Sequence, residues 1–158
     1  MKKLDESLLT GVPPFSKLTR VQIREILDAA QSKRYDVGVA VFSQGMSIER
    51  FFLLLDGHIR VLRTMPGGEQ VITLHIPPGQ LFGIGVALGY TTYPATAMPA
   101  DECIVLSWPS RLWPEFIARY DGFGTETYKV VGERMGEMQN MIADMATKQV
   151  EQRIAGAI

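Results

Sequence analysis

Turn residues interrupt residues 36–83 at short and regular intervals, and this spacing constrains the fold more than any other feature of the chain. Gly38, Gly45, Gly57 and Gly79 lie near Asp, Ser, Gln or Pro, where a tight turn favours a residue that lacks Cβ. Short apolar segments separated by such turns about every ten residues are typical of antiparallel sandwiches and barrels. The spacing therefore predicts a small β-sandwich or barrel.

The segments between the turns have the composition of strands. Residues 51–55 form a fully apolar run. Residues 71–76 alternate, which predicts that Ile72, Leu74 and Ile76 face the interior. Further strands are expected at residues 39–41, 59–62 and 104–106, with a hairpin tip at residues 66–69.

Helices are predicted before and after the strands. Ser16 or Thr19 can cap a first helix, whose apolar stripe consists of Val21, Ile23, Ile26, Leu27 and Ala30. A second helical section is expected at residues 112–117. From about residue 123 a narrow heptad seam predicts a long helix that pairs with a second copy in a parallel homodimer, since a helix lying on the roll would bury a broader face. The seam consists of Tyr128, Val131, Met135, Met138, Ile142 and Met145.

The composition limits the classes of function. A formal net charge of −1 leaves no basic field for nucleic acid, so we do not expect the chain to bind DNA by itself. Cys103 cannot form an internal disulfide and no segment has the pattern of a signal peptide, so a cytoplasmic location is expected. Residues 81–100 carry no charge, but glycines and prolines interrupt them, and no membrane segment is predicted.

Motifs for catalysis are missing from the sequence. His58 and His75 are the only histidines, so the histidine-rich metal site of a jelly-roll metalloenzyme cannot be assembled. There is no Gly-x-Ser-x-Gly segment and no Walker loop. We therefore expect a binding protein that is not an enzyme.

Three segments, Asp36–Gly45, Phe51–Val61 and Pro78–Gly83, together resemble the sensor domain of the CRP and FNR superfamily of bacterial transcription regulators. The resemblance implies a mainly β fold, in which a double-stranded β-helix or jelly roll with flanking helices occupies residues 1–122. A long dimerisation helix is then expected over residues 123–158.

The same resemblance suggests a role in gene regulation. Residues 148–158 resemble the junction to a helix-turn-helix DNA-binding domain, which we expect to be missing from this chain. The implied function is effector sensing and dimerisation, with the signal passed through the dimer helix to that domain. A free-standing small-molecule-binding module of the cyclic-nucleotide type is the alternative.

The resemblance also predicts the ligand pocket. In cyclic-nucleotide-binding members, a Phe-Gly-Glu segment and an Arg-Ser-Ala or Arg-Thr-Ala segment hold the cyclic phosphate and the ribose. Here Ile84 replaces the glutamate and Tyr93 replaces the arginine. Losing one partner of a buried charge pair costs about 2–5 kcal/mol, which argues against tight binding of cyclic AMP. The implied pocket residues are Phe82, Gly83, Ile84, Gly85, Leu88, Tyr93, Ala95 and Thr96.

Two interpretations of this pocket remain open. It holds an apolar or planar ligand against its aromatic and aliphatic walls, or its own side chains fill it. Residues 93–97 are similar to a stretch of nitric-oxide-responsive denitrification regulators, some of which use haem, so the effector is a small molecule or a gas and haem is a candidate cofactor. His58 and His75 are candidate iron ligands, although His75 is expected on the outer face of its strand, and Cys103 is expected to be buried or at a strand edge.

Overall fold

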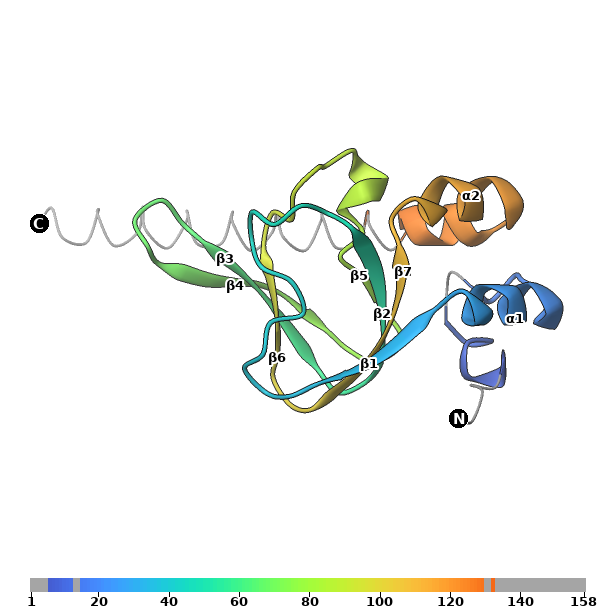
Figure 1. Ribbon diagram of the computed structural model, residues 1–158, viewed down its shortest axis with the longest axis horizontal. Helices are drawn as coiled ribbons and strands as arrows, with labels where there is room; N and C mark the ends of the chain where they lie inside the picture. The colour runs from blue at the N-terminus through green and yellow to red at the C-terminus, as the bar shows by residue number, and fades with distance from the viewer. Residues whose placement is uncertain (1–5, 13–14, 130–131, 133–158) are drawn as a thin grey trace, which may run out of the picture.

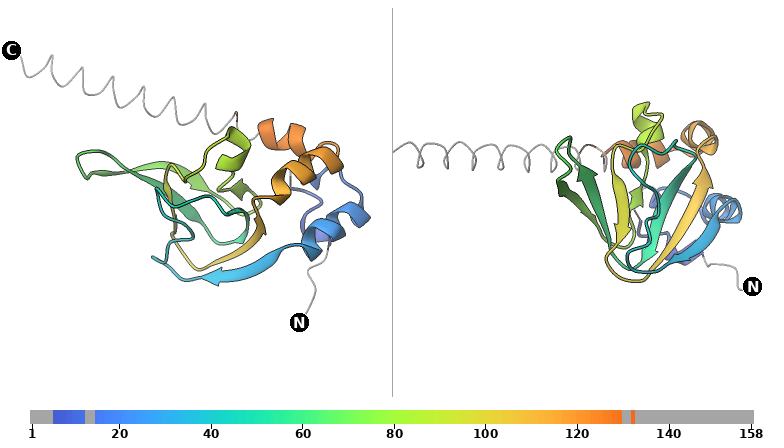
Figure 2. Two further views of the ribbon diagram at one scale, coloured as in Figure 1. Left: turned by 45° about the horizontal axis from the view of Figure 1, so that its top comes forward. Right: turned by 60° about the vertical axis from the view of Figure 1, so that its left-hand side comes forward.

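Two antiparallel sheets face each other in the computed structural model, which describes residues 6–12, 15–129 and 132 (Figures 1 and 2). One sheet has four strands in the order β1-β7-β2-β5, and the other has three in the order β4-β3-β6. The strands are β1 (Gln31–Tyr35), β2 (Arg50–Asp56), β3 (Ile59–Thr64), β4 (Gln70–Ile76), β5 (Leu81–Phe82), β6 (Thr96–Pro99) and β7 (Cys103–Pro109). The predicted mainly β architecture is confirmed.

Strand β2 is buried on both faces, which explains its uninterrupted apolar run. Phe51 and Leu53 belong to a helix-side cluster, packed against the helices, whereas Phe52 and Leu54 belong to a roll-side cluster between the two sheets. None of the four side chains is more than 5% exposed. Successive side chains of a strand point to opposite faces, so this one strand supplies both cores.

Helix α1 (Arg20–Asp28) begins at the cap that the sequence predicts, after the short 3-10 helix η1 (Glu6–Leu8). The Thr19 hydroxyl oxygen accepts a hydrogen bond from the backbone N–H of Gln22 at 3.1 Å. In return the backbone N–H of Thr19 donates to the side-chain oxygen of Gln22 at 3.0 Å. This reciprocal pair is a capping box, and it selects Thr19 rather than Ser16 as the cap.

The buried stripe of α1 is narrower than predicted. Ile23, Ile26 and Leu27 are buried, but Val21 is 70% exposed and its assignment to the stripe is wrong. Val21 precedes Ile23 by two positions, or about 200° around the helix, so it lies on the opposite face. Buried Trp108 of β7 ties the helix to the sheet, because its indole N–H donates to the carbonyl of Ile26 at 2.8 Å.

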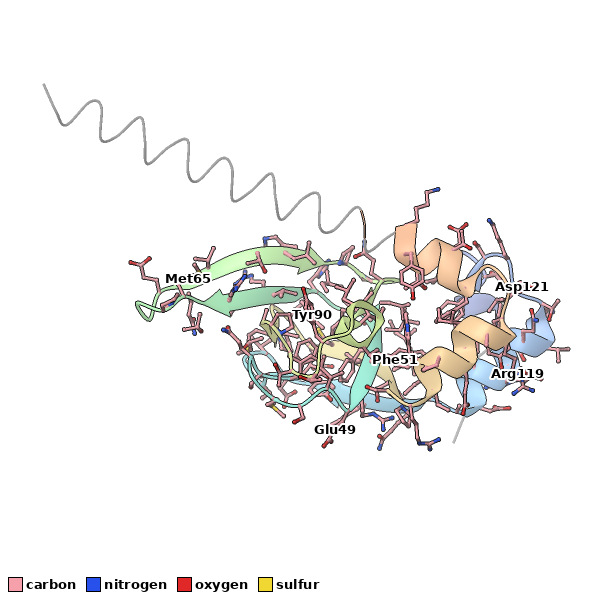
Figure 3. The ribbon with its side chains drawn as sticks, turned by 90° about the horizontal axis from the view of Figure 1, so that it is seen from above. Glu49, Phe51, Met65, Tyr90, Arg119 and Asp121 are labelled. Carbon is pink, nitrogen blue, oxygen red and sulfur yellow. The ribbon has the colours of Figure 1, made fainter. Side chains whose placement is uncertain are left out.

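A second helix, α2 (Leu112–Arg119), follows β7 and confirms the helical section expected there. Its buried side chains are Trp113 and Phe116, and both rings contact Phe51 of β2 edge to face. Figure 3 shows Phe51 on the side of the sheet where the helices lie. The helices therefore cover one face of the four-stranded sheet, and the three-stranded sheet covers the other.

The first strand does not lie where the alternation of Val39 and Val41 predicts it. That segment is irregular and Val39 is 53% exposed, so the expected strand there is wrong. The strand is instead β1, which is polar and pairs with β7 along its whole length, from the pair Gln31–Ser107 to the pair Tyr35–Cys103. Pairing with a distant strand overrides the weak local pattern.

The interior face of β4 is shorter than predicted. Ile76 is buried and Leu74 is half-buried, but Ile72 is 38% exposed, so its interior assignment is wrong. The third strand of this sheet, β6, pairs with β3 only as far as Leu62. Beyond that point the β3–β4 hairpin extends past the body of the roll, as Figure 1 shows, and its residues 63–70 are exposed.

Gly57 shows why the predicted turns require glycine. Its φ angle is +93°, in the region that side chains disfavour. A Cβ at this position would lie 2.5 Å from the carbonyl oxygen of Glu102 and 2.7 Å from the sulfur of Cys103. The three other glycines of the predicted turn pattern also have positive φ, which confirms the turns.

The predicted dimer helix is described only at its beginning. Residues 123–129 are helical, and Tyr128 is 47% exposed. The other seam residues lie outside the described part of the chain, so the seam and the domain boundary at residue 122 stay predictions; these residues are Val131, Met135, Met138, Ile142 and Met145. Within the described ranges, no helix has the length and apolar character that crossing a membrane requires.

Candidate functional site

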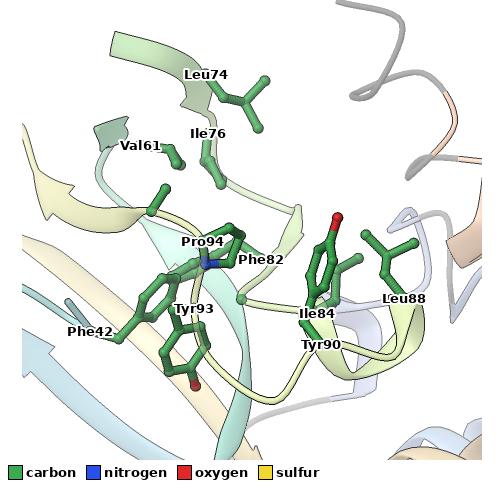
Figure 4. Close-up of a pocket in the computed structure, with 13 residues that line it drawn as sticks. Phe42, Val61, Leu74, Ile76, Phe82, Ile84, Leu88, Tyr90, Tyr93 and Pro94 are labelled. Atoms are coloured by element: carbon green, nitrogen blue, oxygen red, sulfur yellow. The ribbon is translucent and has the colours of Figure 1, made fainter. Parts of the chain in front are cut away.

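An apolar hollow of about 140 Å³ lies inside the roll beside β3, β4 and β5 (Figure 4). Val61 and Leu74, which are paired across β3 and β4, line it together with Ile76. The short 3-10 helix η3 (Gly85–Leu88) and the segment that follows it form another wall. The remaining lining residues are Phe42, Phe82, Gly83, Ile84, Tyr90, Tyr93, Pro94 and Ala95.

Among the described residues, no side chain that lines the apolar hollow carries a charge at neutral pH. The resemblance described above aligns Ile84 with a glutamate and Tyr93 with an arginine of cyclic-nucleotide-binding members. Both are buried, with 7% and 4% of their surfaces exposed. A phosphate in this hollow would lose its hydration, and the described lining residues offer it no cationic side chain in return, which is unfavourable by several kcal/mol.

The stacked rings of Phe42, Phe82 and Tyr93 form the floor of the apolar hollow, and Phe52 extends the stack. Tyr93 lies on Phe42 with ring centroids 3.9 Å apart and an interplanar angle of 16°. Phe42 also stacks on Phe52 and Phe82, at 5.5 Å and 6.2 Å. Because three of these rings line the hollow, a planar apolar molecule can pack against aromatic surface there.

One hydrogen bond holds Tyr93 in this stack. Its hydroxyl donates to the backbone carbonyl of Arg50 at 2.7 Å. Burial raises the pKa of Tyr93 above its ordinary value, so the hydroxyl stays protonated and remains a donor at neutral pH. The ring is thereby fixed with its polar end directed away from the apolar hollow.

Gly83 lets the backbone approach the aromatic stack. A Cβ at Gly83 would lie 2.7 Å from the ring of Phe52 and 2.8 Å from the ring of Phe42. Its φ angle of +64° also favours a residue without a side chain. The Phe82-Gly83 pair that the sequence places in the pocket is therefore required by packing here, whatever the ligand.

Two exposed apolar side chains mark the mouth of the hollow. Leu88 is 41% exposed and Tyr90 is 49% exposed, and both belong to the lining. Tyr90 packs over Gly85, where a Cβ would lie 3.3 Å from the Tyr90 ring and 2.8 Å from Ile48. A change of the Tyr90 rotamer would widen the mouth without moving a strand.

The structure brings together seven of the eight predicted pocket residues. Thr96 is the exception, because it does not line the hollow and its hydroxyl accepts a hydrogen bond from the backbone N–H of Gln44 at 2.9 Å. Six lining residues are not among these eight, namely Phe42, Val61, Leu74, Ile76, Tyr90 and Pro94. The interior face predicted for β4 was a usable signal for Leu74 and Ile76.

Neither histidine lines the apolar hollow. The imidazole Nδ1 of His58 lies 2.9 Å from a carboxylate oxygen of Asp101, at the turn between β2 and β3, and His75 is exposed on β4, as predicted for that strand. Cys103 is fully buried, and burial raises the pKa of its thiol. In the described part of the chain, no three His, Cys, Asp or Glu side chains are grouped closely enough to hold a metal ion.

Comparisons with known proteins agree with this architecture. The family model of the cyclic nucleotide-binding domain matches residues 32–120. A cAMP-dependent protein kinase regulatory subunit of Mycosarcoma maydis is 34% identical over 82 residues, which cover 52% of this chain and 15% of that protein. The cyclic AMP receptor protein of Thermus thermophilus is 23% identical over 150 residues, covering 95% of this chain and 69% of that one.

Solved structures show the same fold. The crystal structure of the Thermus thermophilus catabolite activator protein superposes with a TM-score of 0.75 at 22% identity, and covers 90% of this chain and 67% of that one. The chain spans less than a fifth of the kinase regulatory subunit that it matches. Since the family model covers more than half of the chain, and includes all seven strands except the first residue of β1, the chain belongs to the cyclic nucleotide-binding domain family.

Proposed function

We propose that this chain is the effector-sensing and dimerisation part of a transcription regulator of the CRP and FNR type, and that its effector is a small apolar molecule. The observation that carries the proposal is an apolar hollow whose described lining residues include no charged side chain and include seven of the eight residues expected in the ligand pocket. The similarity to the Thermus thermophilus cyclic AMP receptor protein over 95% of this chain supports the regulator class.

Cyclic AMP suits this hollow poorly for an energetic reason. The phosphate would need compensation for its desolvation, and Ile84 and Tyr93 provide no charge. Every 1.4 kcal/mol lost lowers the affinity tenfold, so the missing charge pairs lower the affinity by a factor of roughly 30 to several thousand.

The volume limits the size of the ligand. Engineered apolar cavities of about 150 Å³ remain dry and bind benzene or xenon. The hollow here has about 140 Å³ and a flat aromatic floor, so a single planar ring or an apolar gas fits without rearrangement. Haem is much larger than one ring, so it could enter only after Leu88 and Tyr90 move outward, and neither His58 nor His75 lines the hollow to bind its iron.

Dimerisation through the heptad seam is the proposed route of the signal. Replacing Met135 and Met138 by Asp would put like charges in the centre of a desolvated helix pair, where an unpaired charge costs several kcal/mol. We expect a dimeric parent and a monomeric double variant by light scattering. Asn140→Asp with Thr147→Asp adds the same charge outside the seam and is expected to remain dimeric. A monomeric parent at micromolar concentration contradicts the seam.

A second candidate is a small-molecule-binding module that acts on another protein rather than on DNA. The 34% identity to a kinase regulatory subunit favours it. The two candidates differ in partner and share the apolar ligand site. If the chain acts in a transcription regulator, ligand binding should change the affinity of that regulator for a specific palindromic DNA.

The ligand is tested with fluorobenzene as an apolar probe, observed by fluorine NMR, beside cyclic AMP followed by calorimetry. We expect saturable binding of fluorobenzene and little or no heat with millimolar cyclic AMP. Leu74→Trp fills the hollow and should abolish fluorobenzene binding, whereas Ile72→Trp, on the same strand outside the hollow, should retain it. Micromolar binding of cyclic AMP, or fluorobenzene binding that survives Leu74→Trp, would overturn the proposal.

A further inference from the structure

A second hollow, of about 230 Å³, lies on the other side of the Phe42 and Tyr93 rings. These two rings border both hollows, so they act as a shared wall. The second space is bounded by the roll-facing side of β1, β7 and β2 and by the irregular segment 41–49. We call it the polar hollow, because arginine, lysine and hydroxyl groups line it.

Strand register brings the polar groups together. Ser107 of β7 pairs with Gln31 of β1 on one side and with Phe52 of β2 on the other. Lys33 and Tyr35 follow Gln31 at alternate positions, so they lie on the same face of the sheet. Towards one end of the strands, the interior of the roll therefore changes from apolar to polar.

Arg50 is the half-buried cation of this hollow. Its Nε donates to the hydroxyl of Ser107 at 2.8 Å, and one terminal nitrogen donates to the Ser107 carbonyl at 3.1 Å. Among the described residues, no carboxylate forms an ion pair with Arg50. A guanidinium has five N–H donors, so donors remain for an anion.

A second cation and one carboxylate complete the charge of the hollow. Lys33 lies 4.9 Å from the centroid of the Tyr35 ring and, within the described ranges, also has no ion-pair partner. Glu49 lines the hollow and is exposed, and Figure 3 shows it at the outer edge of the roll. Among the described lining residues, two positive charges and one negative charge leave a net charge of +1, which a single anionic group would neutralise.

We propose that the polar hollow binds a small aromatic carboxylate, with its carboxylate on Arg50 and Lys33 and its ring against Phe42 and Tyr93. Arginine suits this task because its planar fork matches a carboxylate in two parallel hydrogen bonds. The half-buried position of Arg50 strengthens such a pair relative to one in water. This site lies outside the apolar hollow, and its occupation does not depend on the function proposed above.

The test uses 4-fluorobenzoate as the probe, titrated into the full chain and followed by fluorine NMR. The neutral 4-fluorobenzamide has the same shape, and inorganic phosphate has charge without a ring. We expect 4-fluorobenzoate to bind about tenfold more tightly than the benzamide or phosphate. A tenfold difference in affinity corresponds to the free energy of about one charge-assisted hydrogen bond. Equal affinity for the benzamide, tighter binding of phosphate, or no saturation with the benzoate at millimolar concentration would each overturn the proposal.

Variants locate the probe. Arg50→Gln should remove the preference for benzoate over benzamide, while Arg60→Gln, at an exposed arginine of β3, should leave it unchanged. Lys33 is exposed, so the Lys33→Gln variant should fold normally and tests the site even if Arg50→Gln is unstable. We expect Lys33→Gln to bind benzoate about threefold more weakly than the parent. Leu74→Trp, which fills only the apolar hollow, should not change benzoate binding. If Leu74→Trp abolishes that binding, or Lys33→Gln leaves it unchanged, the assignment is wrong.

Discussion

The two aromatic clusters on opposite faces of β2 pack their rings in different ways. In the helix-side cluster, Phe51 meets Trp113 and Phe116 edge to face, at interplanar angles of 86° and 90°, and only Trp108 lies nearly parallel to it, at 19°. In the roll-side cluster, Phe42 lies within 29° of parallel with each of its ring neighbours. Edge-to-face rings interlock and fill space. Phe42 of the roll-side cluster lines both hollows, whereas Phe51 of the helix-side cluster lines neither of them.

The largest effect is expected from Phe51→Ala in the helix-side cluster. The ring is fully buried and touches three aromatic neighbours, so its loss leaves a cavity that rigid surroundings cannot fill. We expect a decrease of about 4 kcal/mol in the free energy of unfolding, measured with urea. Val21→Ala, at an exposed position of α1, should change it by less than about 0.5 kcal/mol.

Phe42→Ala in the roll-side cluster is expected to cost less, about 3 kcal/mol, because two hollows already border this ring. The same change joins the two hollows and should admit a two-ring probe such as fluoronaphthalene. Urea unfolding and fluorine NMR measure the two effects. If Phe42→Ala costs more than Phe51→Ala, the contrast between the two clusters fails.

Tyr93→Phe removes the hydroxyl that donates to the Arg50 carbonyl and keeps the stacked ring. A net contribution of about 1 kcal/mol to stability is expected for such a bond. Tyr90→Phe at the exposed mouth is the matched control and should be nearly neutral. An equal loss in both variants would show that the hydrogen bond does not position the stack.

The smallest effect concerns acid stability at the far end of the roll from the helices. Hydrogen bonds from the side chain and the backbone N–H of His58 hold the pKa of Asp101 below its ordinary value. The ionised Asp101 carboxylate therefore stabilises the folded state at pH values above its pKa in the unfolded chain, which is about 3.9. This stabilisation is lost as the pH falls through the lower pKa that Asp101 has in the folded protein. Melting temperatures from pH 6 to pH 2 should fall less steeply for Asp101→Asn than for the parent. Asp121→Asn should follow the parent curve.

The parts of the fold that could be predicted from the sequence are those with local causes. Positive φ at Gly57 and Gly79 is a property of the turn itself, and the Thr19 capping box depends on residues three positions apart. The continuous apolar run of β2 also has a simple cause, because both faces of the strand are buried. Each of these features is visible in a few neighbouring residues.

The features that sequence reasoning missed depend on distant partners. Strand β1 has four exposed residues out of five and no apolar alternation, and it forms because β7 offers it a full register of hydrogen bonds. The far wall of the apolar hollow likewise depends on the pairing of Val61 with Leu74. The polar hollow joins residues from β1, β2 and β7, and no motif marks it. Thr96 could have been left out of the expected pocket lining on sequence grounds. Its neighbours Ala95 and Ala97 are buried, and successive side chains of a strand point to opposite faces, so the Thr96 side chain points away from the face that they share.

The wall that Phe42 and Tyr93 form between the two hollows has a consequence for how the domain would respond to two ligands. Protein interiors are nearly incompressible, so any displacement of this ring pair that enlarges one hollow removes the same space from the other. Two occupants that are each large enough to displace the ring pair would compete for volume without ever touching. By thermodynamic reciprocity each would weaken the binding of the other by the same factor, and the domain would report which of two chemicals is in excess.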